Sequence, residues 1–193
     1  VNQYPNIAEW SATTNRLLVF LNEMESLDTL PKDIQVKSSE DLKCHNLTVN
    51  LPQSKALLDN LNLQFTQGEH TLITGPSGIG KSTFMRSLAG IWPFGKGEIH
   101  VETKGLMFLP QKPYMPLGTL KQIISYPSPA ETLPENEFVR LLKLAGLSDL
   151  APRLSNIDDW NRVLSLGEQQ RISILRAIIA KPKWLLMDEA TSS

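Results

Sequence analysis

The sequence predicts an α/β fold with a mostly helical insertion, and three observations support that prediction. From Leu42 onward, short apolar segments typical of strands alternate with helical patterns, and this alternation characterises α/β domains. A glycine-rich octapeptide lies between one such strand and the helix after it. From residue 112 to about residue 160 the chain changes to proline-rich turns and helical patterns.

The first 28 residues are expected to form a helix, because apolar residues from Trp10 to Met24 recur near helical spacing. This helix is either an amphipathic part of the domain or the tail of an upstream domain. Pro31 breaks the pattern, and the polar stretch through Asp41 is typical of a linker. We therefore divide the chain into a helical tail with linker, residues 1–41, and a domain, residues 42–193.

The N-terminal half of the domain is expected to consist of short strands around one helix. The expected strands cover residues 47–51, 57–65, 70–74, 98–101 and 105–109. We expect turns at residues 67–70 and at Gly95 and Gly97, and a helix over residues 81–91 that ends near Trp92.

The rest of the domain contains the insertion, about residues 112–160, and a return to the core, residues 161–193; the other part of the core is residues 42–111. Thr132 and Glu135 have the spacing of a capping box that opens a helix through about Leu144. A later helix is expected over residues 166–180, with one apolar stripe, followed by a buried strand over residues 184–187. The stripe consists of Ile172, Leu175 and Ile179.

Composition excludes several classes of protein. The 193 residues are 41% hydrophobic and 20% charged, which is typical of a globular domain. The net charge is −1, and no basic block indicates a nucleic-acid partner. Cys44 is the only cysteine, so an internal disulfide is excluded. Because the chain begins with Val1 and stops at Ser193 directly after a motif, we expect a piece of a longer protein, truncated at its C-terminus.

Residues Gly75 to Ser82 fill every fixed position of the pattern G-x-x-x-x-G-K-[ST]. Glycines let the backbone wrap a phosphate chain with its N–H groups turned inward, and the following helix directs its positive end at the phosphates. In such a loop Lys81 reaches the β- and γ-phosphates, and the Ser82 hydroxyl binds Mg²⁺. The alternative is a structural turn before a helix, but the strand and helix expected on either side favour phosphate binding.

Two further segments carry candidate chemistry. Asp188 and Glu189 follow an apolar strand, where Asp188 could hold Mg²⁺ and Glu189 could orient or deprotonate a water molecule. The alternative is a strand that simply leaves the core. Ser165 and Glu168 have capping-box spacing, and a helix that begins with a serine hydroxyl and free N–H groups is also an anion site. Both interpretations of Ser165 can hold together.

Over residues 42–193 the chain resembles an ABC-transporter nucleotide-binding domain. The phosphate loop, Gln111 after a strand, the segment 164–170 and the Asp188–Glu189 pair follow one another in the family's order. The resemblance implies a P-loop NTPase (RecA-like) core with an antiparallel β subdomain and an inserted helical subdomain. It also favours the tail interpretation of the N-terminal helix.

Four stretches are most similar to the peroxisomal fatty-acyl half-transporters. They are equally similar to bacterial transporters that fuse a peptide/vitamin B12-uptake-type membrane domain to an ATPase. The stretches are residues 73–76, 91–93, 110–115 and 164–171.

The resemblance implies ATP and Mg²⁺ as cofactors and a set of site residues. The catalytic residues would be Glu189, Gln111 and Lys81, and the metal ligands Ser82, Gln111 and Asp188. The signature segment would contact ATP held by a second copy in a head-to-tail dimer; it consists of Ser165, Leu166, Gly167 and Glu168. The ATP-binding residues would be Gly75, Pro76, Ser77, Gly78, Ile79, Gly80, Lys81, Ser82 and Thr83.

Three departures from the family pattern matter. The third signature position is Leu166 instead of glycine, and the fifth is Glu168 instead of glutamine. Because a carboxylate would lie near phosphate, we prefer a capping role for Glu168 to a role as ligand. The position of the adenine-stacking tyrosine aligns near Leu51, which implies an apolar base contact. The dimer-loop aspartate and the histidine expected further on lie beyond Ser193.

The function that the resemblance implies is the ATPase engine of a membrane transporter. Two half-transporters would pair as a homodimer at the cytoplasmic face of a membrane, most simply a bacterial inner membrane, with the fused transmembrane domain outside this chain. The first alternative is a soluble ABC ATPase of DNA repair or translation. The nearly neutral net charge and the absence of coiled-coil heptads in the sequence count against it. A nucleotide kinase is the second, and Gln111 with the signature counts against it. The third is an ATP-binding module without turnover, which would describe this fragment: monomeric and nearly inactive.

Overall fold

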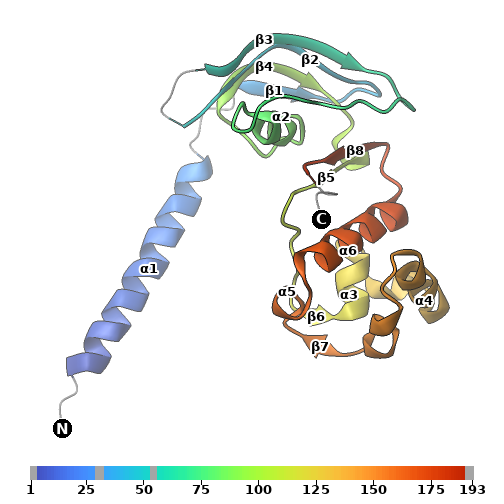
Figure 1. Ribbon diagram of the computed structural model, residues 1–193. Coiled ribbons are helices and arrows are strands. Elements are labelled where there is room, and N and C mark those ends of the chain that lie inside the picture. The colour runs from blue at the N-terminus through green and yellow to red at the C-terminus, as the bar shows by residue number, and fades with distance from the viewer. Residues whose placement is uncertain (1–3, 29–32, 53–55, 190–193) are drawn as a thin grey trace.

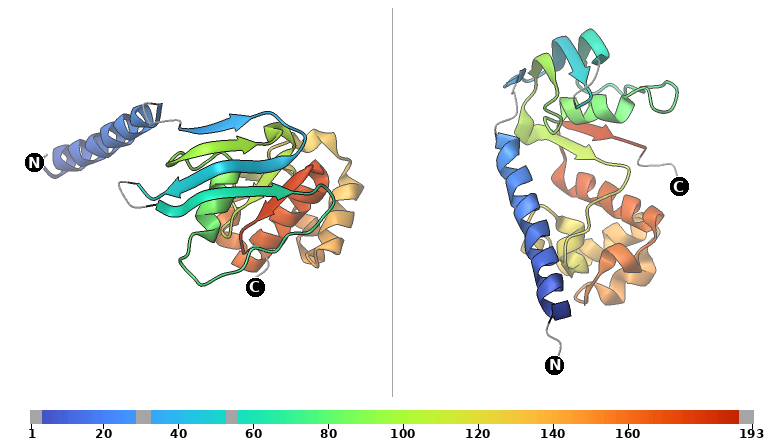
Figure 2. Two further views of the ribbon diagram at one scale, coloured as in Figure 1. Left: turned by 90° about the horizontal axis from the view of Figure 1, so that it is seen from above. Right: turned by 90° about the vertical axis from the view of Figure 1, so that its left-hand side faces the viewer.

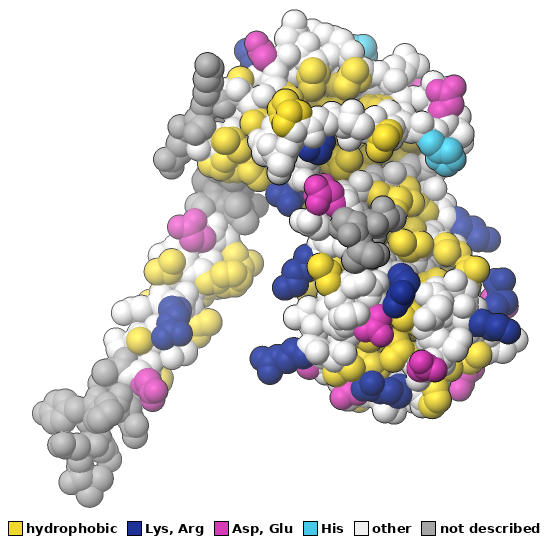
Figure 3. Space-filling view, viewed as in Figure 1, with side chains coloured by type: hydrophobic (Ala, Val, Ile, Leu, Met, Phe, Trp, Pro, Cys, Tyr) yellow, Lys and Arg dark blue, Asp and Glu magenta, His cyan; other side chains and the backbone are white. Residues whose placement is uncertain are grey.

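The computed structural model describes residues 4–28, 33–52 and 56–189. Helix α1, Tyr4–Asp28, lies within the predicted helix 1–28, whose first three residues are outside the described residues. Figure 1 and the left view of Figure 2 show α1 as a rod that stands apart from the rest of the chain. The apolar side chains of residues 9–25 are exposed, among them Trp10 at 71% and Phe20 at 61%, and they are scattered along the rod in Figure 3. No helix within the described residues is long and apolar enough to cross a membrane.

A four-stranded sheet follows α1, in the order β1-β4-β2-β3. Strand β4 is parallel to β1 and antiparallel to β2, which is antiparallel to β3. The strands are β1 (Ile34–Lys37), β2 (Leu42–Asn50), β3 (Ala56–Phe65) and β4 (Gly95–His100).

Two sequence expectations are wrong in this sheet. The stretch predicted as linker contains β1, because four residues are too few to reveal a strand period and the pairing partner lies in β4. The predicted turn at Gly95 and Gly97 lies inside β4. Both glycines are needed there for close packing: a Cβ on Gly97 would lie 2.5 Å from the carbonyl oxygen of Asn46 in β2.

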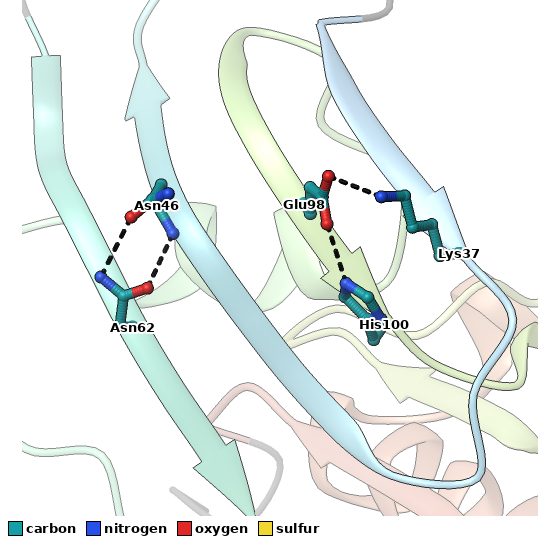
Figure 4. A network of polar contacts seen from close by, with 5 residues as sticks. All are labelled: Lys37, Asn46, Asn62, Glu98 and His100. Atoms are coloured by element: carbon teal, nitrogen blue, oxygen red, sulfur yellow. Dashed lines mark hydrogen bonds and ion pairs between the residues drawn. The ribbon is translucent and has the colours of Figure 1, made fainter.

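The two faces of the four-stranded sheet differ in polarity. The inner face packs on helix α2, Lys81–Leu88, which ends three residues before its predicted end. The outer face carries a polar network (Figure 4), in which the Glu98 carboxylate accepts bonds from Lys37 at 2.6 Å and from His100 at 3.0 Å. These bonds lower the pKa of Glu98. The core under the sheet includes Leu42, Cys44, Leu47, Val49, Phe84, Leu88, Ile99 and Val101.

A second, two-stranded parallel sheet lies between the first sheet and the helices (Figure 1). It pairs β5, Leu106–Leu109, with β8, Trp184–Met187. The strand predicted over residues 70–74 is wrong: the segment is unpaired, and Leu72 is 85% exposed. A strand exists only where a neighbour supplies hydrogen bonds, and β8 pairs with β5 alone among the described residues.

The helical part forms its own core below the second sheet. Helix α6, Leu166–Ala180, begins and ends as predicted, and its Ile172 and Leu175 are fully buried in this core. The predicted Thr132–Glu135 capping box is wrong, because Pro134 precedes the helix and the Glu135 carboxylate instead pairs with Lys121 at 2.5 Å. The other elements are β6 (Gly118–Thr119), α3 (Leu120–Ser125), α4 (Glu135–Leu144), β7 (Ile157–Asp158), α5 (Trp160–Val163) and three 3₁₀ turns (Thr103–Gly105, Ala130–Thr132, Ser148–Arg153).

The close approach of β4 and β2 gives a first prediction. Gly97→Ala places a methyl group against the backbone of β2 at a φ of +114°, so it should lower the free energy of unfolding by about 2 to 4 kcal/mol. Gly90→Ala is the control, because its φ is +73° but nothing lies within 4 Å of its Cβ. Urea unfolding of both variants measures the difference. Equal losses would contradict a packing role for Gly97.

Candidate functional site

The glycine-rich loop, Gly75–Ser82, leads directly into α2 as predicted. Gly80 precedes the helix with a φ of +105°, a backbone conformation that side chains rarely adopt. A Cβ at Gly80 would also lie 2.4 Å from the side chain of Leu57. The loop is exposed from Gly75 to Ile79, so its backbone is accessible to a ligand at the start of the helix.

The Lys81 ammonium group lies over the loop that precedes it. Its Nζ donates hydrogen bonds to the carbonyl oxygens of Gly75 and Pro76, each at 2.9 Å. An ammonium group has three N–H donors, and these two bonds hold its charge against the loop backbone. The ammonium charge of Lys81 therefore lies close to the N-terminal end of α2, which carries the positive end of the helix dipole.

Ser82 and Asp188 meet although they are 106 residues apart. The Ser82 hydroxyl donates to Asp188 Oδ1 at 2.7 Å, and the Asp188 N–H donates to the carbonyl oxygen of Leu109 in β5 at 2.9 Å. Asp188 is buried, with 4% of its surface exposed. Hydroxyl and carboxylate oxygens are the hard donors that Mg²⁺ prefers, usually together with phosphate oxygens of a substrate. The pair therefore fits the magnesium site that the sequence predicts.

Gln111 and Glu189 form the second long-range pair. The Gln111 side-chain N–H donates to Glu189 Oε2 at 2.8 Å across 78 residues. They meet because β5 and β8 are parallel and in register, so the residues that follow them emerge at one edge of the sheet. Glu189 has a φ of +47°, and non-glycine residues in this region often occur at functional sites.

A cavity of about 550 Å³ lies beside these pairs. The unpaired segment 69–73 forms one wall, and α2 and β8 form the others. Its lining is apolar along β8, and it is polar near the loop, where Lys81, Asp188 and Glu189 contribute, and at the start of the segment 69–73. The candidate site thus lies at the edge of the cavity where the loop meets the end of β8.

The signature residues lie elsewhere. Figure 1 places the start of α6, beside α5, well away from α2. Ser165 and Leu166 are exposed, and Ser165 caps α6 with a full capping box to Glu168, as predicted. The hydrogen bonds from the Ser165 hydroxyl and backbone N–H lower the pKa of Glu168. The structure therefore does not bring Ser165 to the loop of its own chain.

Two side chains of α6, for which the sequence predicts no individual role, connect the helix to Gln111 and to the segment that follows it. Gln170 donates from its side chain to the Gln111 carbonyl oxygen at 3.1 Å. Arg176, 5% exposed, donates to the carbonyl oxygens of Tyr114 at 2.7 Å and Ile123 at 2.8 Å. Burial lowers the pKa of Arg176 to about 10, so it stays charged at neutral pH. The sequence carries no local signal for this role, because the partners of Arg176 lie more than 50 residues away along the chain.

Comparisons with known proteins point to one family. A family model described as ABC transporter matches residues 58–192. A Synechocystis protein named as an ABC transporter ATP-binding protein is 40% identical over 100% of this chain and 31% of its own length. The Escherichia coli inner membrane ABC transporter ATP-binding protein YddA is 33% identical over 100% of the chain and 33% of its own length. The human lysosomal cobalamin transporter ABCD4 is 39% identical over 76% of the chain and 27% of its own length. The chain spans about a third of the length of these relatives, or less.

The buried guanidinium of Arg176 gives the second prediction. Arg176→Met keeps the apolar stem but leaves the buried carbonyl oxygen of Ile123 and the partly buried one of Tyr114 without their donor, so the free energy of unfolding should fall by about 2 to 4 kcal/mol. Arg171→Met on the same helix is the matched control, because Arg171 is exposed and its loss should cost less than about 0.5 kcal/mol. Denaturant unfolding separates the two; similar losses would refute the role of Arg176.

Proposed function

Because this chain belongs to the ABC transporter family, as an ATP-binding domain, we propose that it binds Mg–ATP at the Gly75–Ser82 loop and that its hydrolysis powers transport across a membrane. The family membership confirms the resemblance that the motifs predicted. The names of the relatives favour a transporter over a soluble ATPase of DNA repair or translation.

The observation that carries this proposal is the 2.7 Å bond between the Ser82 hydroxyl and Asp188. It joins the end of the phosphate loop to the end of β8, so the two groups expected to hold the metal face one another. Mg²⁺, when bound, neutralises charge on the β- and γ-phosphates. Lys81, at the start of α2, adds a second positive charge toward those phosphates.

Glu189 is the residue that we propose orients or deprotonates the attacking water. Gln111 donates a side-chain N–H to Glu189, and this bond orients the carboxylate. The side-chain oxygen of Gln111 is not used in this bond, and we propose it as a metal ligand. Asp188 is buried directly beside Glu189. The two neighbouring carboxylates thus take different roles, since one faces Ser82 and the other faces Gln111.

The site in one chain lacks the signature contact, because α6, which Ser165 caps, begins well away from α2. We propose that Ser165, Leu166 and Gly167 meet ATP bound to a second copy, whereas Glu168 caps α6, so that one chain alone hydrolyses ATP weakly. The second copy belongs to an identical half-transporter, whose membrane domain precedes α1. Residues 1–41 then connect that membrane domain to the ATP-binding domain, residues 42–193, within which about 112–160 form the helical subdomain.

The protein acts at the cytoplasmic face of a membrane in this proposal. The Escherichia coli relative is named as an inner membrane protein, and a bacterial inner membrane is the location that we propose for this protein. No nucleic-acid partner is expected, because the net charge is −1 and no basic block occurs.

Lys81 gives the third prediction. Lys81→Ala removes the positive charge beside the loop carbonyls and should raise the Kd for ATP by about a hundredfold. Isothermal titration calorimetry with Mg–ATP measures this. Lys143→Ala, at an exposed position in the last turn of α4, serves as control and should bind ATP as the parent does. Unchanged affinity in Lys81→Ala would remove the loop from the binding site.

Glu189 gives the fourth prediction. Glu189→Gln in the intact protein should keep the ATP affinity and lower the hydrolysis rate by about 10² to 10⁴, because an amide cannot accept the proton. Phosphate release and nucleotide binding are measured on the same samples. Glu131→Gln, exposed in the 3₁₀ turn Ala130–Thr132, controls for the loss of one surface charge. Normal turnover of Glu189→Gln would exclude Glu189 as the catalytic residue.

A further inference from the structure

Both hydrogen-bond donors of Ser165 converge on one oxygen of Glu168. The backbone N–H of Ser165 lies 2.8 Å from Glu168 Oε2, and the Ser165 hydroxyl lies 2.7 Å from the same atom. A charged oxygen that accepts an N–H and an O–H at a helix start has the environment of a bound anion. The donors of Ser165 are therefore already engaged with an anionic group of their own chain.

This contact goes beyond what a capping box requires. The chain has a second box at the start of α3, in which Gln122 Oε1 accepts from the Thr119 N–H at 2.8 Å and Thr119 Oγ1 accepts from the Gln122 N–H. Within the described residues, the Thr119 hydroxyl does not donate to Gln122. A glutamine at the third position of the helix thus completes the capping box without a hydrogen bond from the hydroxyl. Glu168, in contrast, accepts a hydrogen bond from the Ser165 hydroxyl.

We infer that Glu168 competes with the γ-phosphate of ATP on a second copy for the donors of Ser165, and thereby sets the affinity of ATP-driven pairing. This inference rests on the proposed role of Ser165. A hydroxyl has a single proton to donate, so Ser165 cannot serve Glu168 and a phosphate oxygen together. The carboxylate also repels the phosphate as long as it remains at Ser165.

The Glu168 carboxylate has an alternative partner in Arg171. Arg171 lies one turn further along α6, with an exposed guanidinium, and its charge attracts the Glu168 carboxylate and helps to lower its pKa. Residues at this spacing lie on one helix face and can form an ion pair. When phosphate takes the Ser165 donors, the Glu168 side chain turns toward Arg171. The free energy needed to move the Glu168 side chain away from Ser165 lowers the affinity of the ATP-driven pairing of the two copies.

Glu168→Gln tests the inference, because glutamine keeps the capping box and removes the charge. In the intact protein, the KM for ATP in hydrolysis should fall about tenfold, which corresponds to about 1.4 kcal/mol. The kcat should change less than about twofold, because the residues around Ser82 and Glu189 are untouched. An unchanged urea midpoint verifies that α6 remains folded. Glu137→Gln, in the first turn of α4, is the matched control and should leave the KM as it is.

A double-mutant cycle separates this inference from the proposed function. Ser165→Ala should raise the KM, and adding Glu168→Gln to Ser165→Ala should lower it by much less than Glu168→Gln alone does, because only the backbone N–H of residue 165 remains to be released. A lower KM that depends on Ser165 supports the inference. If Ser165→Ala raises the KM but Glu168→Gln does not lower it, the inference alone fails. If Ser165→Ala has no effect, the proposed role of Ser165 fails, and the inference fails with it.

Discussion

The parallel pairing of β5 with β8 is the interaction on which the candidate site depends. It aligns Leu109 with Met187, so Gln111 and the Asp188–Glu189 pair leave the sheet at the same edge. The Asp188 N–H extends this pairing by donating to Leu109, which fixes a buried carboxylate opposite the hydroxyl of Ser82. A slip of one residue would turn every side chain to the opposite face and would separate both pairs.

Helix α6 connects this edge to the helical part. Ile172 and Leu175 lie in the helical core, whereas Ala177 packs against Leu109 of β5. Arg176 and Gln170 add polar contacts to the segment that follows Gln111. A movement at the start of α6, where Ser165 is exposed, can therefore be transmitted to Gln111 through one rigid element. In the proposed dimer, the partner's ATP and the catalytic carboxylate would be linked by this helix.

Elements with a local signal were predicted well. The capping residue Ser165 marks the start of α6 correctly, and the helix ends at Ala180 as predicted. The apolar run before Asp188 is β8. Failures occurred where pairing with a distant segment decides the conformation. β1 forms because β4 lies beside it, and residues 70–74 remain unpaired although they have the composition of a strand. Likewise, Thr132 and Glu135 have capping-box spacing, but Pro134 begins the helix and Glu135 reaches Lys121 instead.

The sequence by itself determined the family and the residue types of the loop, because the spacing from Gly75 to Ser82 and the order of the motifs are properties of the chain alone. Only the tertiary structure decided which of these groups meet. Ser82 faces Asp188 and Gln111 faces Glu189 across 106 and 78 residues, while Ser165 stays apart and bonds to Glu168. The physical reason is that a side chain's type and local cap are encoded within a few residues, whereas a strand register and a helix position are set by packing across the whole domain.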